Sequence, residues 1–206
     1  RYTPESDDIP WAWVPEKKIT PEDFKYILST YMQGSPWDAY AKNGDPRYRT
    51  IACPNTNVTA ICQIRGYMPD ALKAIEWIAF GVTLLDAMAP LYAHVSKMPD
   101  YMSKVENTPS TENFCWASRI LGAAAEPHFD VTGTRIERYQ DAVCGKGRQL
   151  ILEADKQMLK SGVFDRMEAT NQKIADMTKK ETGDALADVL IDAYAGMKIK
   201  YNRGKY

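Results

Sequence analysis

The 206-residue sequence predicts an α+β fold with a few antiparallel strands and a predominantly helical C-terminal region. Two observations lead to this prediction. Apolar residues alternate along residues 57–65 and 74–81, which is the period of a β-strand, whereas from about residue 109 onward they recur at helical spacing. Strands early and helices late favour a small sheet covered by helices. We expect a single-domain fragment over residues 1–206, with an arm, a helix and strands in residues 1–100 and a helical part in residues 101–206.

The first 18 residues are rich in proline and charge, and they carry Trp11 and Trp13. We expect an extended arm whose aromatic rings pack on a neighbouring surface. The run Thr20-Pro21-Glu22-Asp23 predicts a helix start, because threonine caps a helix and proline suits its first position. Helical spacing continues to Tyr31, and Gly34 predicts the end of the helix.

The predicted strand over residues 57–65 is fairly apolar on both faces, so we expect it to be covered on both sides. Pro69 and Asp70 predict a turn before the second strand, and a weaker extended segment follows at residues 90–95. Glu76 lies inside the second strand. We expect it to form a structural ion pair with Arg65 across the two strands, in preference to a catalytic role.

The helical part begins with a predicted start at residues 108–110 and a helix that ends near Pro127. A long helix is predicted between residues 132 and 161, in which Gly145 and Gly147 each weaken the helix by about 1 kcal/mol and mark a kink. Two further helices are predicted over residues 163–180 and 182–200.

Composition excludes several classes of function. The net charge of −1 gives no overall basic footprint for nucleic acid, and the basic C-terminal tail reads as a solvated helix end: Lys198, Lys200, Arg203 and Lys205. No apolar run approaches the roughly 20 residues of a membrane span. No motif for a cofactor is present, and neither histidine, His94 nor His128, has an evident partner.

The four cysteines are Cys53, Cys62, Cys115 and Cys144, and they lack the spacing of metal ligands. We expect reduced, buried thiols in a cytoplasmic protein and no bound metal. Pairing of Cys53 with Cys62 across a short connection remains the alternative.

An ordered series of segments carries a family resemblance. The segments are ITPEDFKYILSTYMQGSPWD, YRTI, NVTAICQIR, AIEWIAFG, LDAMAPLYAHVSKMPDYM and STENFCWASRILGAAAE. The series resembles the C-terminal half of the N-terminal-nucleophile cysteine dipeptidases, a group that includes the secernins and is similar to penicillin V acylase and choloylglycine hydrolase. The resemblance implies part of a four-layer αββα sandwich. It also implies catalysis by an N-terminal cysteine whose α-amine is the general base.

The chain departs from the family at its start, because residue 1 is Arg1 and the segment with the nucleophilic cysteine is absent. We therefore expect a processed or clipped chain that is inactive alone. The resemblance implies that Arg49 supports the nucleophile of the missing half, with Arg47 and Arg65 as weaker candidates. It also implies that three residues shape a dipeptide pocket: Trp37, Asp38 and Tyr40. A surface arginine at a strand entrance is the alternative interpretation of Arg49.

The expected partners are a dipeptide substrate, the missing N-terminal half and further copies of the chain, because an isolated part of the sheet would expose apolar edges. A second hypothesis is a non-catalytic binding or assembly module. In that case the aromatic arm with Trp11 and Trp13, together with the helical C-terminus, would form the surface for a partner.

Overall fold

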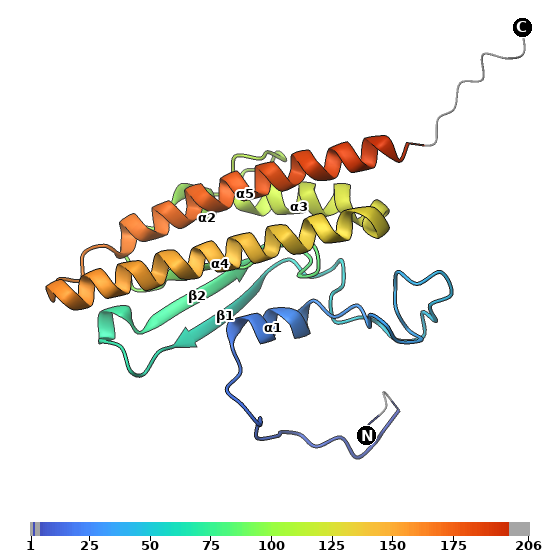
Figure 1. Cartoon of the computed structure of the whole chain (residues 1–206), viewed down its shortest axis with the longest axis horizontal. Coiled ribbons are helices and arrows are strands. Elements are labelled where there is room, and N and C mark those ends of the chain that lie inside the picture. The colour runs from blue at the N-terminus through green and yellow to red at the C-terminus, as the bar shows by residue number, and fades with distance from the viewer. Residues whose placement is uncertain (1, 3–4, 198–206) are drawn as a thin grey trace, which may run out of the picture.

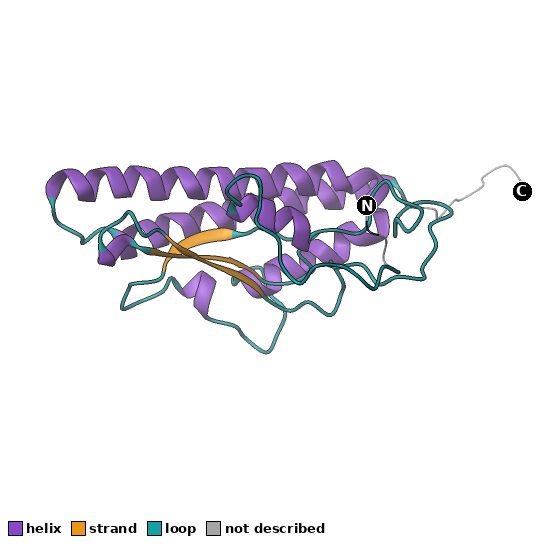
Figure 2. Ribbon diagram, turned by 90° about the horizontal axis from the view of Figure 1, so that it is seen from below, coloured by secondary structure: helices purple, strands orange, loops and turns teal. Residues whose placement is uncertain are grey.

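The computed structural model describes residue 2 and residues 5–197 and has the predicted α+β organisation (Figure 1). Three antiparallel strands form one sheet in the order β1-β2-β3, with bounds Thr59–Ile64, Ala74–Ala79 and Ala89–Tyr92. Arg1 and the basic C-terminal tail lie outside the described residues. Figure 2 shows the strands against the long helices, while the arm and the segment after the first helix are mostly irregular.

Five α-helices occur in the described residues: α1 (Pro21–Leu28), α2 (Asp100–Ser103), α3 (Phe114–Ala125), α4 (Phe129–Ser161) and α5 (Met167–Ala195). Two short 3₁₀ turns, η1 (Asp70–Leu72) and η2 (Glu126–His128), complete the elements. The long helices α4 and α5 run side by side, and both contact β3 (Figure 1). None of these helices, within the part of the chain described, is long and apolar enough to cross a membrane.

The start of α1 follows the prediction. The Thr20 hydroxyl accepts a hydrogen bond from the Asp23 amide at 3.2 Å, and the Thr20 amide donates to the Asp23 carboxylate at 2.8 Å. This reciprocal pair satisfies two backbone groups at the helix start. The predicted end was wrong, because α1 stops at Leu28 and Gly34 lies in a later turn with φ of +68°.

The later helices differ from the prediction at their boundaries. The cap of α3 is Asn113, whose side chain accepts from the Trp116 amide at 2.9 Å, rather than a residue of the 108–110 segment. Two helices were predicted over residues 163–180 and 182–200. The structure has one continuous helix, α5, from Met167 to Ala195. The last residues of the second predicted helix lie outside the described residues. The junction at residues 180–182 contains no helix-breaking residue, so nothing in the sequence forces two helices.

One face of the sheet packs on α4, and Gly147 permits this close contact. A Cβ atom at Gly147 would lie 2.6 Å from Cδ of Pro90 in β3. Next to it, the Arg148 guanidinium lies 5.5 Å from the centre of the Trp77 ring. Helix α4 continues through Gly145 and Gly147 as one element. Gly147 therefore has a packing role against β3, which the prediction of a kink did not include.

The two edges of the sheet differ. At the β3 edge, Pro90 has no N–H group, and the Asn171 side chain of α5 binds both the amide and the carbonyl of Tyr92, at 2.8 and 3.0 Å. At the β1 edge, no strand of the described residues pairs with the outward side. One edge is thus closed and the other is open.

The prediction that the first strand is covered on both sides was wrong. Arg65, directly after β1, donates its amide to the Lys73 carbonyl at 2.8 Å, so alternate β1 residues bond to β2. The remaining residues, Ala60, Cys62 and Ile64, direct their backbone groups to the open edge and are exposed, Ile64 by 67%. The alternation alone does not reveal which face lies against the helices.

The predicted ion pair between Arg65 and Glu76 was also wrong. Arg65 is buried and binds the Asp155 carboxylate of α4, with a second contact at 3.3 Å, and it also donates to the Leu72 carbonyl. Tyr92 donates its hydroxyl to the same carboxylate at 2.7 Å. The partner of Arg65 comes from 90 residues later in the chain, where no local sequence pattern could indicate it.

The arm does not place both of its tryptophan rings on the rest of the described chain. Trp11 is fully exposed, and Trp13 is 68% exposed, with the Tyr2 ring 5.3 Å away between centroids. Among the described residues, the expected packing of the arm on a neighbouring surface is therefore not found.

Candidate functional site

A pocket of about 360 Å³ lies in the irregular segment between α1 and β1. Its walls come from two stretches, residues 37–46 and 48–55. The residues with functional chemistry among them are Trp37, Asp38, Asp45, Tyr48, Arg49 and Cys53. This pocket therefore joins the residue predicted to support a nucleophile with two of those predicted to shape a dipeptide site.

Left-handed backbone at two positions shapes the first wall. Met32 has φ of +64° and Gly34 has φ of +68°, and Met32 is the one non-glycine with positive φ among the described residues. The turn directs the Gly34 amide to the Asp38 carboxylate at 3.0 Å, and the Tyr40 amide reaches its other oxygen at 2.9 Å. Because a non-glycine residue is disfavoured in this conformation, the segment is held in place by its surroundings.

Gly44 brings the two ends of the first wall together. A Cβ atom at this position would lie 2.0 Å from the Asp38 carbonyl oxygen, so any side chain would push this stretch away. The neighbouring Asp45 amide donates to the Pro36 carbonyl at 2.9 Å. The backbone around Asp38 is thus fixed from both sides, and its carboxylate has a defined position.

An aromatic pair forms part of the pocket wall. The rings of Trp37 and Tyr48 meet edge to face with 5.2 Å between their centroids. The Tyr48 hydroxyl donates to Glu5 of the arm, and this bond raises the Tyr48 pKa. These rings give the pocket an apolar surface next to its charged groups.

The two arginines of the pocket region differ in their partners. Arg47 forms ion pairs with Glu5 and Asp45, at 3.7 and 3.4 Å. Arg49 lines the pocket, is exposed, and makes no hydrogen bond or ion pair within the described residues. A free guanidinium carries five donors, so Arg49 is the residue of this pocket that can receive an anionic group.

Cys53 lies in the same pocket, and its sequence neighbours shape its chemistry. A hydrogen bond with the Thr56 hydroxyl, with 3.8 Å between Sγ and Oγ1, lowers its thiol pKa, and the Asn55 amide and the Arg49 charge act in the same direction. Sequence reasoning had not placed this cysteine beside Arg49. The Cys-Pro-Asn-Thr run was the available signal, because Asn and Thr after proline favour a turn that folds back on the thiol.

The other residues proposed from the sequence lie elsewhere. Tyr40 stacks on Phe129 of α4, with 4.2 Å between ring centroids, and burial raises its pKa to about 12. Tyr40 therefore anchors the segment to the helices instead of lining the pocket. Arg65 is held in the buried ion pair with Asp155.

The thiols are free, but the expectation that all are buried was wrong. Cys115 is buried, Cys53 and Cys144 are half-buried, and Cys62 is exposed on the open strand. Across the residues that the structure describes, no group of His, Cys, Asp and Glu side chains gathers that could hold a metal ion.

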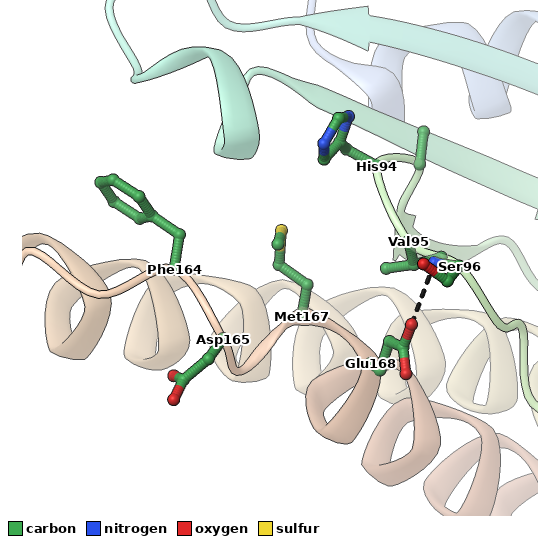
Figure 3. Close-up of a pocket in the computed structure, with 8 residues that line it drawn as sticks. His94, Val95, Ser96, Phe164, Asp165, Met167 and Glu168 are labelled. Atoms are coloured by element: carbon green, nitrogen blue, oxygen red, sulfur yellow. Dashed lines mark hydrogen bonds between the residues drawn. The ribbon is translucent and has the colours of Figure 1, made fainter.

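A second pocket of about 440 Å³ lies where the loop after β3 meets the turn between α4 and α5 (Figure 3). His94, Phe164 and Met167 extend toward the same space, whereas Asp165 points away from it. Glu168 accepts hydrogen bonds from the Ser96 and Lys97 amides, at 2.9 and 3.1 Å. His94 has no carboxylate partner there among the described residues, so this pocket does not assemble an acid–base pair.

Two buried ionisable side chains, Asp86 and Lys25, lie near α1. Burial raises the Asp86 pKa to about 7 and lowers the Lys25 pKa to about 8. Asp86 accepts from the Phe80 and Ala87 amides at 2.6 and 2.7 Å, and Lys25 donates to Ser29 at 2.7 Å and to the Thr83 carbonyl. Lys25 therefore joins α1 to the segment after β2 through Thr83, while Asp86 binds the backbone of that segment.

Comparison with known proteins gives one consistent result. The sequence profile of peptidase family C69 matches residues 1–142. A dipeptidase of Bifidobacterium longum is 39% identical over 172 residues, which cover 82% of this chain and 32% of the relative. A probable dipeptidase A of Streptococcus pyogenes serotype M18 is 34% identical over 194 residues, which cover 92% of this chain and 41% of the relative. Dipeptidase A of Lactobacillus helveticus is 26% identical over a match that covers 97% of this chain and 44% of the relative. The chain thus spans less than half the length of these relatives.

Proposed function

This chain belongs to peptidase family C69, and we propose that it is the C-terminal part of a dipeptidase that hydrolyses dipeptides through an N-terminal cysteine outside this chain. The names of the relatives support the activity, and the matched share of their length supports the assignment as a part. The single observation that carries the role of this part is the free guanidinium of Arg49 in the pocket with Trp37 and Asp38.

The proposed reaction uses this part as a support. The cysteine thiolate attacks the peptide carbonyl, the C–N bond breaks, and the leaving amine takes a proton that the α-amine of the cysteine had accepted. Water then hydrolyses the acyl-enzyme. Arg49 contributes charge-assisted hydrogen bonds to the thiolate or to the developing oxyanion, which are stronger than bonds between neutral groups.

The open edge of β1 supports the second part of the proposal. We propose that a strand from the rest of a longer polypeptide pairs with Ala60, Cys62 and Ile64 and completes one sheet of an αββα sandwich. The Ile64 side chain projects from a face of the sheet and is 67% exposed, which suits cover by a second layer of the sandwich. A cytoplasmic location with free thiols and association of further copies belong to the same proposal.

The test compares the complete polypeptide with residues 1–206. The complete polypeptide is expected to cleave dipeptides, and residues 1–206 alone are expected to cleave none. Arg49→Met in the complete polypeptide should lower kcat/KM by about 10²–10³. Arg47→Met is the matched control, since Arg47 is already paired with Glu5 and Asp45, and it should change kcat/KM by less than about tenfold. Dipeptide cleavage by residues 1–206 alone would overturn the proposal.

The second candidate is a non-catalytic binding or assembly module, which the exposure of Trp11 and Trp13 favours. Tryptophan is among the residues that contribute most often to the binding energy of protein interfaces. A complete polypeptide that cleaves no dipeptide, yet binds a partner less tightly after Trp11→Ala, would favour this candidate over the dipeptidase.

A further inference from the structure

The pocket between α1 and β1 is lined by groups of opposite charge. One is the free guanidinium of Arg49. The others are two carboxylates that differ in their partners: Asp45 forms an ion pair with Arg47 at 3.4 Å, whereas Asp38 forms none within the described residues. Asp38 is therefore the carboxylate of this pocket whose charge no side chain balances.

The position of Asp38 is unusually well defined for an irregular segment. Each of its oxygens accepts one backbone amide, from Gly34 and from Tyr40, at 3.0 and 2.9 Å. A carboxylate has about four acceptor sites, so both oxygens keep a site for a further donor. The left-handed turn at Met32 and the contact of Gly44 with the Asp38 backbone hold this arrangement.

We propose that Asp38 binds the α-ammonium group of the dipeptide and so makes a free N-terminus a requirement for binding. The inference rests on the proposed dipeptidase function and names the substrate group that this pocket recognises. The ammonium group has three donors for the free acceptor sites of Asp38. The neighbouring rings of Trp37 and Tyr48 add a favourable surface for a cation.

Arg49, in the same pocket, fits the same proposal. In a dipeptide the carbonyl that is attacked lies two bonds from the ammonium nitrogen, so the groups that receive them must share one small space. Asp38 and Arg49 line one pocket of about 360 Å³, a volume within the usual range of small-molecule sites. Asp38 then positions the substrate, and Arg49 faces the carbonyl where negative charge develops.

The test is a titration of residues 1–206 with dipeptide ligands, monitored by NMR. The amides of Gly34 and Tyr40 report directly on the Asp38 carboxylate, because both donate to it. Ala-Ala should shift both signals saturably at millimolar concentration. N-acetyl-Ala-Ala keeps the carboxylate but has no ammonium group, and it should bind about tenfold more weakly or worse. Equal binding of the two ligands, or no saturable shift with Ala-Ala, would overturn the proposal.

Two variants in the same pocket separate recognition from simple charge. Asp38→Asn should abolish the preference for Ala-Ala over its N-acetyl derivative, and Asp45→Asn should keep it, because the Asp45 carboxylate is paired with Arg47. Unchanged spectra of the α4 and α5 amides show that each variant is folded. A preference that survives in folded Asp38→Asn would exclude Asp38 as the ammonium site.

The complete polypeptide distinguishes failure of this inference from failure of the proposed function. If it cleaves Ala-Ala and N-acetyl-Ala-Ala with equal kcat/KM, ammonium recognition by Asp38 is wrong while the dipeptidase function stands. If it cleaves neither, the proposed function is wrong, and the NMR titration still decides whether Asp38 binds an ammonium group.

Discussion

Arg65, directly after β1, and Asp155, in the C-terminal third of α4, form a buried ion pair that joins the sheet to the longest of the described helices. Tyr92 of β3 shares the carboxylate through a hydrogen bond of 2.7 Å, and the Arg65 guanidinium lies 6.0 Å from the centre of the Tyr92 ring. A strand end, a second strand and a helix thus meet at one carboxylate. Burial and the bond to Asp155 raise the pKa of Tyr92.

Removing Asp155 is predicted to destabilise the fold strongly. Asp155→Ala leaves the Arg65 charge buried without a counter-ion, so we expect a loss of about 3–5 kcal/mol in the free energy of unfolding. Chemical denaturation measures it. The control is Asp184→Ala, which breaks the exposed pair with Lys180 and should cost at most about 1 kcal/mol. Similar losses in the two variants would contradict the role of the buried pair.

Two glycines of α4 provide a matched pair of alanine substitutions. Gly147→Ala places a Cβ atom 2.6 Å from the Pro90 ring and should destabilise by about 1–3 kcal/mol, although alanine favours a helix. At Gly145 nothing lies within 4 Å of the new Cβ, so Gly145→Ala should stabilise by about 1 kcal/mol. Thermal unfolding of both variants checks the difference, and stabilisation by Gly147→Ala would show that β3 does not pack this closely.

The buried Asp86 predicts a pH dependence of stability. Its pKa is about 7 in the folded chain, against a reference value of 3.8. Between about pH 4 and 7, the Asp86 carboxyl is therefore protonated in the folded chain and ionised in the unfolded chain. The contribution of Asp86 to stability is therefore fully present at low pH and lost as the pH rises through about 7. Asp86→Asn should remove this loss. Relative to the wild type, the variant should gain stability from pH 5 to pH 8, on the order of a few kcal/mol.

Lys25 acts in another pH range and allows an internal check. Its pKa falls from 10.5 to about 8 on folding, so its contribution is present above about pH 10.5 and is lost as the pH falls toward 8. Thermal unfolding from pH 5 to 10 separates the two windows. Asp184→Asn, at an exposed position of α5, should leave the pH profile between 5 and 8 unchanged. A wild-type and an Asp86→Asn profile of the same shape would refute the assignment to Asp86.

Cys53 is predicted to react faster with alkylating reagents than its partial burial alone suggests, because the Thr56 hydroxyl lowers its pKa. Thr56→Val should slow alkylation of Cys53 at pH 7 by about twofold to fivefold. Exposed Cys62, in the same molecule, serves as the reference thiol and should keep its rate. Mass spectrometry of the peptides measures both rates, and an unchanged ratio of the two would rule out the Thr56 contact.

Local signals in the sequence predicted the elements well and their partners poorly. The Thr20 cap and the alternation in β1 and β2 act over a few residues, so they could be identified directly. The partner of Arg65 could not be identified in this way. Nothing in the sequence distinguishes Asp155 from the other acidic residues, and only the packing of α4 brings it near Arg65. The same holds for the site. The resemblance proposed Arg49, and its role stays a prediction, whereas the place of Cys53 in the same pocket depends on the turn at residues 53–56.

The difference between the sheet edges limits how copies of this chain can associate through strands. At the β3 edge, Pro90 has no N–H group and Asn171 occupies both backbone groups of Tyr92, whereas no described strand pairs with the outward side of β1. A strand added at β1 therefore meets a sheet that cannot extend on its other side. Pairing of two β1 edges would consume both open edges, so the expected product is a closed pair with twofold symmetry and not a growing fibre.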